Sequence, residues 1–287
     1  MDLYQLEYFV EVARQGSFTK AAAKVGIVQP ALSQQIKRLE EEFGTPLVVR
    51  DRRQARLTPA GETLLEHARQ LLAMAQHTRE SIVGLAELKH GRLTIAAIPA
   101  VSAFHLPAHI NRFRRRHSGI ELVILEESSS GVAELVANGT AELGFLQLPE
   151  PDQRLEGTAL LSEPHLVLVH QRHRLAALKS VPLRQLAGEP FIQYRGKVRD
   201  SVLQACRQSG FDPKIACATG ELATVHALTQ AGLGIAILPR MAIPRGLKGV
   251  RAVPLTRPGL WRELGIVRRH GAPASMAAQA FLEPFSG

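Results

Sequence analysis

The spacing of apolar residues predicts three short helices near the start of the chain. Hydrophobic side chains recur at steps of three and four in Leu3–Ala13, Phe18–Val25 and Pro30–Phe43, so each segment has one face that can be buried. A glycine, the residue best suited to the backbone turn that ends a helix, follows each segment. These glycines are Gly16, Gly26 and Gly44. Residues 18–37 therefore form a pair of short helices joined by a tight turn.

Two short strands and one long helix are predicted next. Leu47–Arg50 and Ala55–Leu57 flank a basic tip at residues 51–54. From Thr58 to about Leu88 the apolar positions alternate steps of four and three, which is typical of a helix that pairs with another helix. These positions are Leu64, Ala68, Leu71, Ala75, Thr78, Ile82 and Leu85. We assign residues 1–58 to a first domain and residues 59–89, a helix roughly 45 Å long, to dimerisation.

After His90-Gly91 the pattern becomes an alternation of strands and helices. The first run has strands at 93–98, 120–125 and 142–146 and helices at 104–116 and 132–138. The second run has strands at 166–169, 190–193, 215–219 and 234–238 and helices at 200–209 and 222–231, and a strand at 264–267 and a helix at 275–285 close the chain. Because such alternation is typical of parallel sheets, we expect residues 90–287 to form an α/β domain. Its two lobes would be residues 90–162 with 266–287 (lobe I) and residues 163–265 (lobe II).

The charge balance points to a class of partner. The 287 residues carry a formal net charge of +9, with a pI of about 10.1, which favours polyanions and nucleic acid first among them. The two cysteines do not require a disulfide framework. We see no secretory signal peptide, and the longest apolar stretches, such as Leu93–Val101, are too short to span a membrane. We therefore expect a cytoplasmic protein with no membrane partner.

The helix pair at residues 18–37 is the strongest candidate for a binding site. In a winged helix-turn-helix the second helix enters the major groove, where glutamine pairs with adenine and serine contacts bases or phosphates. Arginines on the wing would lie along the DNA backbone or in the minor groove. The candidate DNA contacts are Ser17, Thr19, Gln29, Pro30, Ser33, Gln34, Lys37, Arg50, Arg52, Arg53 and Arg56. Spacing alone leaves one alternative open, an amphipathic helix pair whose polar face is only solvated.

Three motifs follow one another here: G-S-F-T-K-A-A at Gly16–Ala22, Q-P-A-L-S-Q-Q-I-K-R-L at Gln29–Leu39, and L-T-P-A-G at Leu57–Gly61. Together with Gly44–Leu47 they resemble the family pattern of LysR-type transcriptional regulators, and the similarity continues through the α/β part. The resemblance implies DNA binding. Val28 departs from the pattern, because the family usually has a serine there that caps the recognition helix. Its loss would remove about 1 kcal/mol of capping.

The resemblance also implies the remaining architecture. Residues 59–89 would be the linker helix, which pairs antiparallel in a homodimer, and a dimer or a tetramer would sit on inverted-repeat double-stranded DNA. Residues 90–287 would be an effector domain related to periplasmic binding proteins, with crossover strands near Leu160–Pro164 and Arg262–Gly265. A small-molecule co-inducer, and no other cofactor, would change how the dimers pair, how they bend DNA and how RNA polymerase is recruited. The implied fold is thus a winged helix-turn-helix, a long linker helix and a two-lobed α/β effector domain.

Mapped onto this sequence, the cleft between the lobes is lined by strand ends and helix starts, where free N–H groups suit anions. The candidate effector contacts are Ser102, Ser128, Ser129, Ser130, Arg195, Lys197, Arg199, Thr219 and Gly220. Pro99 and Ala100 stand where the family often has hydroxyls, so we expect an apolar first-lobe wall and an acid with a hydrophobic body as the ligand. Two alternatives remain open: the serines only cap a helix, and the three basic side chains only face water.

The sequence contains no motif typical of an enzyme or of a metal site. The sequence has no phosphate-binding loop, no G-x-S-x-G and no metal-ligand cluster, so we expect neither an enzyme nor a metal site. His165, His170 and His173 fall close together without matching a known site. The family includes peroxide sensors, and Cys206 aligns near their resolving thiol. Lys197 takes the place of their reactive thiol, so we interpret Cys206 as a core residue. The rival interpretation is a solute-binding or enzymatic α/β protein with a helical appendage, which would need an export signal or a convergent catalytic site.

Overall fold

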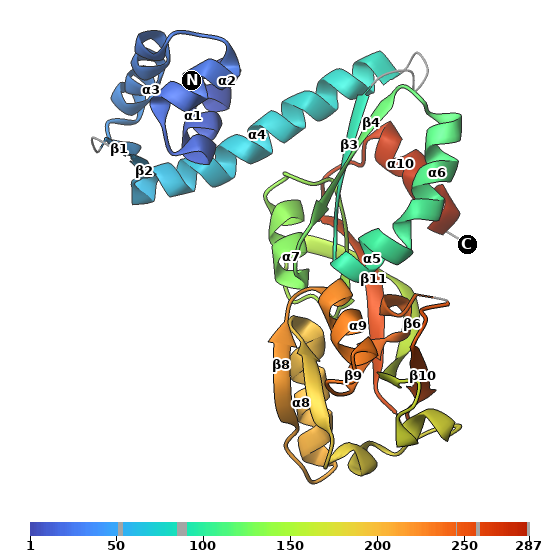
Figure 1. Cartoon of the computed structure of the whole chain (residues 1–287). Coiled ribbons are helices and arrows are strands. Elements are labelled where there is room, and N and C mark those ends of the chain that lie inside the picture. Colours follow the sequence, from blue (N-terminus) through green and yellow to red (C-terminus); the bar gives the residue numbers. More distant parts are fainter. Residues whose placement is uncertain (51–53, 85–90, 245, 257–258, 286–287) are drawn as a thin grey trace. The chain divides into compact units, whose positions relative to one another are not determined.

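The computed structural model describes residues 1–50, 54–84, 91–244, 246–256 and 259–285 (Figure 1). The chain forms two compact units. The first unit includes Met1–Glu87, and the second unit includes Leu88–Ala137 and Ala141–Gly287. None of the described helices is long and apolar enough to cross a lipid bilayer.

Three helices pack around one hydrophobic core in the first unit. They are α1 (Leu3–Gln15), α2 (Phe18–Val25) and α3 (Gln29–Phe43). Their buried side chains follow the predicted helical spacing, and the largest are Leu6, Phe9, Leu32, Ile36 and Leu39. Gly26 ends α2 with a φ of 73°, in the left-handed region that favours glycine, so the chain can turn sharply into α3. The predicted helix-turn-helix is confirmed.

A two-stranded wing joins α3 to the long helix. β1 (Val48–Arg50) and β2 (Ala55–Leu57) are antiparallel, and α4 follows at Pro59–Gly84. The carboxylate of Glu40, near the end of α3, accepts hydrogen bonds from the backbone N–H groups of Leu47 and Val48 at 2.9 and 3.1 Å. These bonds fix the wing against the helix. At the start of α4, a Cβ on Gly61 would overlap the carbonyl oxygen of Leu47, so only glycine fits there.

The apolar seam of α4 has two parts, which corrects the prediction of one continuous pairing face. Leu64 and Ala68 are buried in the core of the first unit, because α4 packs against α1. Farther along the helix, Leu71 and Met74 are each 44% exposed. Two further predicted positions lie outside the described part of the chain: the side chain of Ile82 and the whole of Leu85. The seam is therefore available to a partner helix only from Leu71 onward.

Lobe I of the second unit is a sheet covered by helices. Its elements are β3 (Gly91–Ala97), α5 (Pro99–Phe104), α6 (Leu106–Arg116), β4 (Ile120–Glu126), α7 (Ser129–Ala137), β5 (Leu143–Leu148), α10 (Met276–Leu282) and the 3-10 turn η4 (Glu283–Phe285). The helix predicted at 104–116 is confirmed as α6, which begins two residues later, whereas α5 before it was not predicted. Pro107 lacks the N–H that a continuous helix would need, so α5 and α6 are separate. The core of the lobe includes Phe113, Phe145 and Phe281.

Lobe II begins on the long strand β6. Its elements are β6 (Leu155–His170), η1 (Arg174–Ala177), η2 (Leu183–Leu186), β7 (Pro190–Tyr194), α8 (Lys197–Gln208), β8 (Lys214–Thr219), α9 (Leu222–Gln230), β9 (Ala236–Pro239), η3 (Arg240–Ala242), β10 (Val250–Pro254) and β11 (Trp261–Arg269). Three of these strands differ clearly from the prediction. β6 and β11 are much longer than the predicted 166–169 and 264–267. β10 was not predicted, because its exposed Arg251 and two prolines nearby interrupt the apolar pattern.

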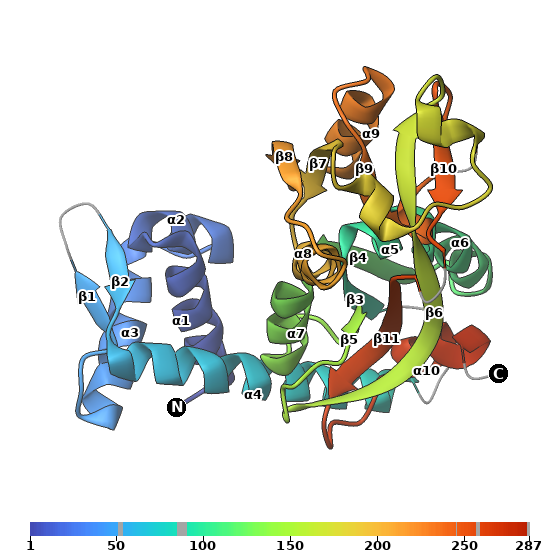
Figure 2. The same ribbon diagram turned by 90° about the horizontal axis from the view of Figure 1, so that it is seen from below.

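Two strands run through both lobes and contain the predicted crossover segments. The strand order is β10-β6-β11-β5-β3-β4, with β9 also paired to β6, and the long β6 is seen beside β11 in Figure 2. β3 is parallel to β4 and β5, and β7 is parallel to β8, whereas β11 is antiparallel to β5 and β6. The expectation of parallel sheets is therefore right only in part, and the main sheet is mixed. β6 carries the chain from lobe I to lobe II and β11 carries it back, so the two run in opposite directions.

Candidate functional site

The helix α3 has a polar face opposite its buried face. Gln29, Gln34 and Lys37 are exposed, and Ser33 is half-buried. Residues 29, 33 and 37 are four apart and therefore form one stripe along the helix. Pro30 is exposed in the first turn. This face can offer amide, hydroxyl and ammonium groups to a groove in a binding partner.

The other predicted contacts of the first unit lie on α2 and on the wing. Ser17 caps α2, because its hydroxyl accepts a hydrogen bond at 3.4 Å from the backbone N–H three residues on. Thr19 is exposed beside it. Arg56 is exposed on β2, and Arg50 is the last residue of β1. Two predicted contacts at the tip lie outside the described residues: Arg52 and Arg53.

The N-terminus of α3 has no side-chain cap. Val28 occupies the N-cap position with an extended backbone and makes no capping hydrogen bond. Its side chain is 69% exposed, although valine is apolar. Pro30 has no N–H, and the N–H groups of Ala31 and Leu32 donate to the carbonyl of Val28 at 3.0 and 3.2 Å. In the first turn of α3 the N–H of Gln29 therefore stays available to an anion such as a phosphate, which a helix N-terminus suits.

The two lobes of the second unit touch through α5 and η3. Ala100, at the start of α5, is buried in an apolar cluster whose other members, such as Leu238 and Ala242, belong to lobe II. In return, Met241 of η3 packs against the core of lobe I. The predicted apolar wall at Ala100 is thus covered by lobe II side chains.

The serine loop before α7 is engaged in local hydrogen bonds. Ser128 Oγ accepts from the N–H of Gly131 at 3.2 Å and lies 3.1 Å from Ser130 Oγ, an arrangement that caps α7. Ser129 is buried, and its Oγ accepts from the N–H of Gln147 at 3.3 Å. Ser128 and Ser130 remain exposed, whereas Ser129 serves the packing of lobe I.

The three predicted cations of lobe II differ in their surroundings. Lys197 Nζ donates hydrogen bonds to the backbone carbonyls of Gln147 at 3.0 Å and Pro149 at 2.7 Å, both in lobe I. Arg195 and Arg199 are exposed, and neither makes an ion pair with another described residue. These two arginines are the members of the trio that offer an unpaired charge to a ligand.

Carboxylates also line the ends of the strands, and the sequence prediction did not include them. Ser102 Oγ donates to Glu126 Oε1 at 2.6 Å at the end of β4. Thr219 Oγ1 accepts from the N–H of Glu221 at 3.1 Å after β8, and Gly220 between them borders open space. Both glutamates are exposed. The cleft loops therefore carry negative as well as positive charge.

A buried ion pair joins the two crossover strands, and it too was missed. Glu163 of β6 and Arg262 of β11 are 6% and 5% exposed and face each other in register. Arg262 Nε donates to Glu163 Oε1 at 2.8 Å, and the other carboxylate oxygen accepts from the N–H of Met241 at 2.6 Å. Burial lowers the pKa of Arg262, and Glu163 opposes that lowering. A charged residue within each crossover segment was the signal available in the sequence.

Tyr194, the last residue of β7, lies where the charges of the lobes and the crossover strands meet. Burial raises its pKa, Arg262 lowers it, and Glu221 and Glu126 raise it. All three charged groups are therefore within electrostatic reach of the phenol. The site thus brings together one group from lobe I, two from lobe II and one from the crossover strands.

His165 lies near the ion pair on β6, and its Nδ1 is 3.2 Å from the carbonyl oxygen of Leu260. A carbonyl only accepts, so Nδ1 carries the proton and Nε2 is an acceptor. Nε2 is buried without a partner among the described residues. Arg262 Nη2 is buried beside Glu163 Oε1 at 2.6 Å, but it makes no well-aligned hydrogen bond. Burial, and then the charge of Arg262, lower the pKa of His165 to about 4.

Acidification is expected to destabilise the second unit through His165. Its pKa is about 4 in the fold and 6.5 in an ordinary side chain, so the fold favours the neutral imidazole. This contribution is essentially complete above pH 6.5 and is lost as the pH falls toward 4, by about 2 kcal/mol between pH 7 and pH 5. Urea denaturation followed by circular dichroism measures the change. His165→Gln should show a flatter pH dependence, and equal pH dependence in the two proteins would contradict the expectation.

The cysteines show no sign of redox chemistry. Cys206 belongs to the core of lobe II, and burial raises its pKa to about 11. Because the thiolate is the reactive form, this thiol is inert at neutral pH. Cys217 is half-buried on β8, and both cysteines are free. Within the described residues, no group of three or more histidine, cysteine, aspartate or glutamate side chains could hold a metal ion.

Two family models match the chain and together cover nearly all of it. Residues 3–62 match the bacterial regulatory helix-turn-helix of the lysR family, and residues 86–285 match the LysR substrate binding domain. The chain belongs to the LysR family of transcriptional regulators. As a LysR-type regulator it is a DNA-binding protein and not an enzyme, and its second unit is the effector-binding domain.

Relatives of this LysR-type regulator extend the similarity over the full length. YwbI, an HTH-type transcriptional regulator of Bacillus subtilis (strain 168), is 33% identical over 287 residues, which cover 99% of this chain and 95% of the relative. A full-length OxyR variant of Pseudomonas aeruginosa superposes with a TM-score of 0.80 at 25% identity, over 99% of this chain and 95% of that one. Full-length CbnR in complex with its target DNA shares the fold, with a TM-score of 0.70 at 23% identity over 99% of each chain.

Proposed function

We propose that this LysR-type regulator binds inverted-repeat operator DNA as a homodimer, with the α3 helix of each protomer in a major groove. The observation that carries the proposal is the exposed polar face of α3. Gln29, Ser33 and Gln34 contact base edges, and Lys37 contacts a phosphate. Lys37 Nζ lies 3.4 Å from Glu41 Oε1. Because this ion pair is exposed, replacing it by a contact with a phosphate costs little free energy.

The remaining contacts position the protein along the DNA backbone. The N–H of Gln29 at the start of α3 and the hydroxyls of Ser17 and Thr19 bind phosphates, and the wing arginines lie along the backbone or in the minor groove. The polar and charged contacts are Ser17, Thr19, Arg50, Arg52, Arg53 and Arg56, and Pro30 makes an apolar contact beside them. They supply affinity that depends on salt, and the base contacts of α3 supply the sequence preference.

Gln34→Ala is expected to weaken binding to the specific operator by about 1–3 kcal/mol, since one amide contact to a base edge is lost. Binding to DNA of scrambled sequence should hardly change, because phosphate contacts remain. Fluorescence anisotropy with DNA from upstream of the protein's own gene measures both affinities. Gln171→Ala, at an exposed glutamine of the second unit, is the matched control. Wild-type affinity of Gln34→Ala for the operator would show that this residue does not face the groove.

The effector of this regulator is a small anion, held between the lobes. The exposed charges of Arg195 and Arg199 support the anion, and the exposed Ser128 and Ser130 can donate hydrogen bonds to it. The other proposed contacts are Ser102, Lys197, Thr219 and Gly220. A thermal-shift screen of aliphatic and aromatic carboxylates against amino acids tests this ligand class. Stabilisation by neutral compounds alone would refute the anionic assignment.

The proposal extends to how the protein oligomerises and how it controls transcription. The exposed Leu71 and Met74 of α4 support pairing with a second linker helix, and two dimers form a tetramer. Ligand binding between the lobes changes how dimers pair and how far the DNA is bent. This change alters the recruitment of RNA polymerase in the cytoplasm. DNase footprints with and without a stabilising ligand from the screen test the link, because a changed bend moves the sites of enhanced cleavage.

A further inference from the structure

Lys197 connects the two lobes of the effector domain by direct hydrogen bonds. It begins α8 in lobe II, and its Nζ donates to the carbonyls of Gln147 at 3.0 Å and Pro149 at 2.7 Å, at the end of β5 and just beyond it in lobe I. We propose that Lys197 is a clasp that sets the closure of the lobes, and that an anionic ligand acts by taking its ammonium from these carbonyls. The second half of this inference rests on the function proposed above.

The first acceptor is held rigidly by the core of lobe I. Gln147 is 7% exposed, and its N–H donates to Ser129 Oγ at 3.3 Å. Ser129 is also 7% exposed. Successive peptide groups of β5 are further fixed by pairing with β11. The carbonyl of Gln147 is therefore a fixed point toward which a flexible lysine side chain must reach.

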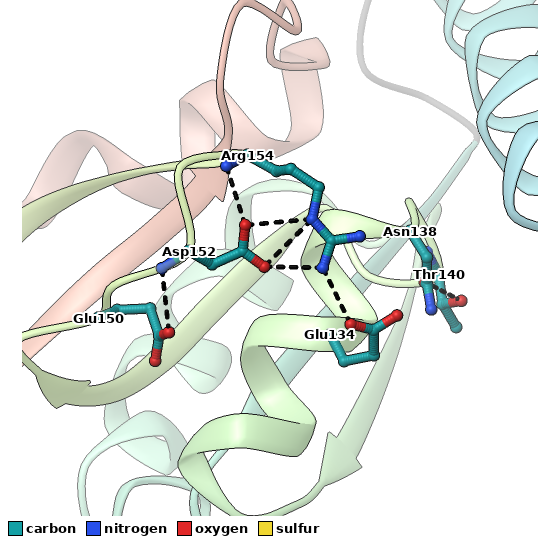
Figure 3. A network of polar contacts seen from close by, with 6 residues as sticks. All are labelled: Glu134, Asn138, Thr140, Glu150, Asp152 and Arg154. Atoms are coloured by element: carbon teal, nitrogen blue, oxygen red, sulfur yellow. Dashed lines mark hydrogen bonds and ion pairs between the residues drawn. The ribbon is translucent and has the colours of Figure 1, made fainter.

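The second acceptor lies on a loop that an ionic network anchors (Figure 3). Arg154 Nη2 lies 2.7 Å from Asp152 Oδ2 and 3.0 Å from Glu134 Oε2 on α7, and the N–H of Arg154 donates to Asp152 Oδ1 at 2.9 Å. The hydrogen bonds from Arg154 lower the pKa of Asp152, so both groups are charged at neutral pH. The network ties the loop that carries Pro149 to α7. Arg154 is thus a positioning residue for the clasp.

The lysine is held equally well from the side of lobe II. Gly196 before it has a φ of 113°, a conformation that other residues rarely adopt, and the N–H of Arg195 donates to the carbonyl of Thr219 at 2.8 Å. Val198 after it is buried in the core of lobe II. The backbone on both sides of Lys197 is therefore fixed, which places the start of its side chain opposite the two carbonyls.

The charge of Lys197 makes the clasp responsive to a ligand. Within the described part of the chain it makes no ion pair, so two neutral carbonyls hold a full positive charge. A carboxylate or phosphate is a stronger acceptor than a carbonyl. An anion that enters beside Arg195 and Arg199 therefore competes for the ammonium and releases the end of β5. The lobes would then be held by the crossover strands and the contact of α5 with η3.

Hydrogen exchange of the full-length protein tests the clasp without any ligand. Lys197→Met keeps the length of the side chain but removes the donor. Backbone amides of residues 150 and 152–155 in lobe I and 197–201 in lobe II should both exchange about tenfold faster, which corresponds to about 1.4 kcal/mol of opening free energy. Lys214→Met removes an exposed lysine of β8 and is the matched control, with no expected change. Faster exchange in 197–201 alone would overturn the clasp, because that is the result of merely fraying α8.

A double-mutant cycle tests the positioning role of Arg154. If the network only holds the loop, Arg154→Met and Lys197→Met act independently. If it presents Pro149 to the lysine, the two effects on exchange in 197–201 are not additive, because the second substitution finds the clasp already weakened. Full additivity would overturn this role of Arg154.

Operator binding by Lys197→Met, measured without added small molecules, tests the regulatory half. A shift in operator affinity of at least about fivefold relative to Lys214→Met is expected if closure of the lobes is coupled to DNA binding. Faster exchange in both segments with unchanged operator affinity would support the clasp but refute the coupling of lobe closure to DNA binding. Absence of operator binding by the wild-type protein would instead refute the function proposed above. The hydrogen-exchange experiment would still test the clasp, because it needs neither DNA nor a ligand.

Discussion

Arg262→Met is expected to lower the free energy of unfolding of the effector domain by about 3–5 kcal/mol. The substitution leaves the carboxylate of Glu163 buried, with the N–H of Met241 as its remaining partner. A buried charge without its counter-ion is far more costly than the absence of the whole pair. Urea denaturation followed by circular dichroism measures the loss.

The strand β11 offers a matched control for this substitution. Arg268 pairs with Glu156 at 2.7 Å, but their side chains are 46% and 37% exposed. Arg268→Met should therefore change stability by about 1 kcal/mol or less. Adding Glu163→Gln to Arg262→Met should recover part of the stability, because the uncompensated charge is then removed. Equal losses for Arg262→Met and Arg268→Met would mean that the buried pair contributes no more than a surface pair.

Leu71→Asp combined with Met74→Asp is expected to break the homodimer and to lower operator affinity about 100-fold or more. The two apolar side chains are each 44% exposed and do not belong to the hydrophobic core of the first unit. Two carboxylates there would oppose burial against a second helix. A single protomer then binds one half-site and loses the gain that comes from linking two binding events. Sedimentation measures the assembly, and anisotropy measures the affinity.

Two exposed positions on α9 provide the control for added charge. Thr224→Asp with Ala227→Asp introduces the same two carboxylates at the same spacing on a helix of the second unit. This variant should remain dimeric and bind the operator normally. An intact dimer for the α4 variant would mean that the protomers associate through another surface.

The first unit could be predicted in detail because its determinants are local. Helical spacing, the glycine after each helix and the cap at Ser17 all lie within a few residues of the elements that they define. The seam of α4 shows the limit of such reasoning. Its spacing correctly indicated an apolar stripe, but spacing cannot tell that Leu64 and Ala68 are buried against α1 of the same chain.

The chemistry of the second unit depended on contacts that no local pattern contains. Glu163 and Arg262 are 99 positions apart, and Lys197 reaches carbonyls 50 and 48 positions away. The sequence indicated Lys197 as a cation of the cleft, but its partners are backbone groups, which every residue possesses and no motif identifies. The serines were recognised at the correct loop, and only the packing of Ser129 against β5 separates it from its exposed neighbours.

The path of β6 and β11 sets the order in which the molecule can be completed during synthesis. β11 lies between β5 and β6, and together with α10 it brings Leu264, Val267 and Phe281 into the core of lobe I. The core of the first unit, in contrast, is drawn entirely from residues up to Leu72. A chain leaves the ribosome N-terminus first, and its domains fold as units. The first unit, which binds DNA, can therefore fold before β11 of the effector domain has been synthesised. A chain cut short before β11 would retain a folded DNA-binding unit but lack a complete effector domain.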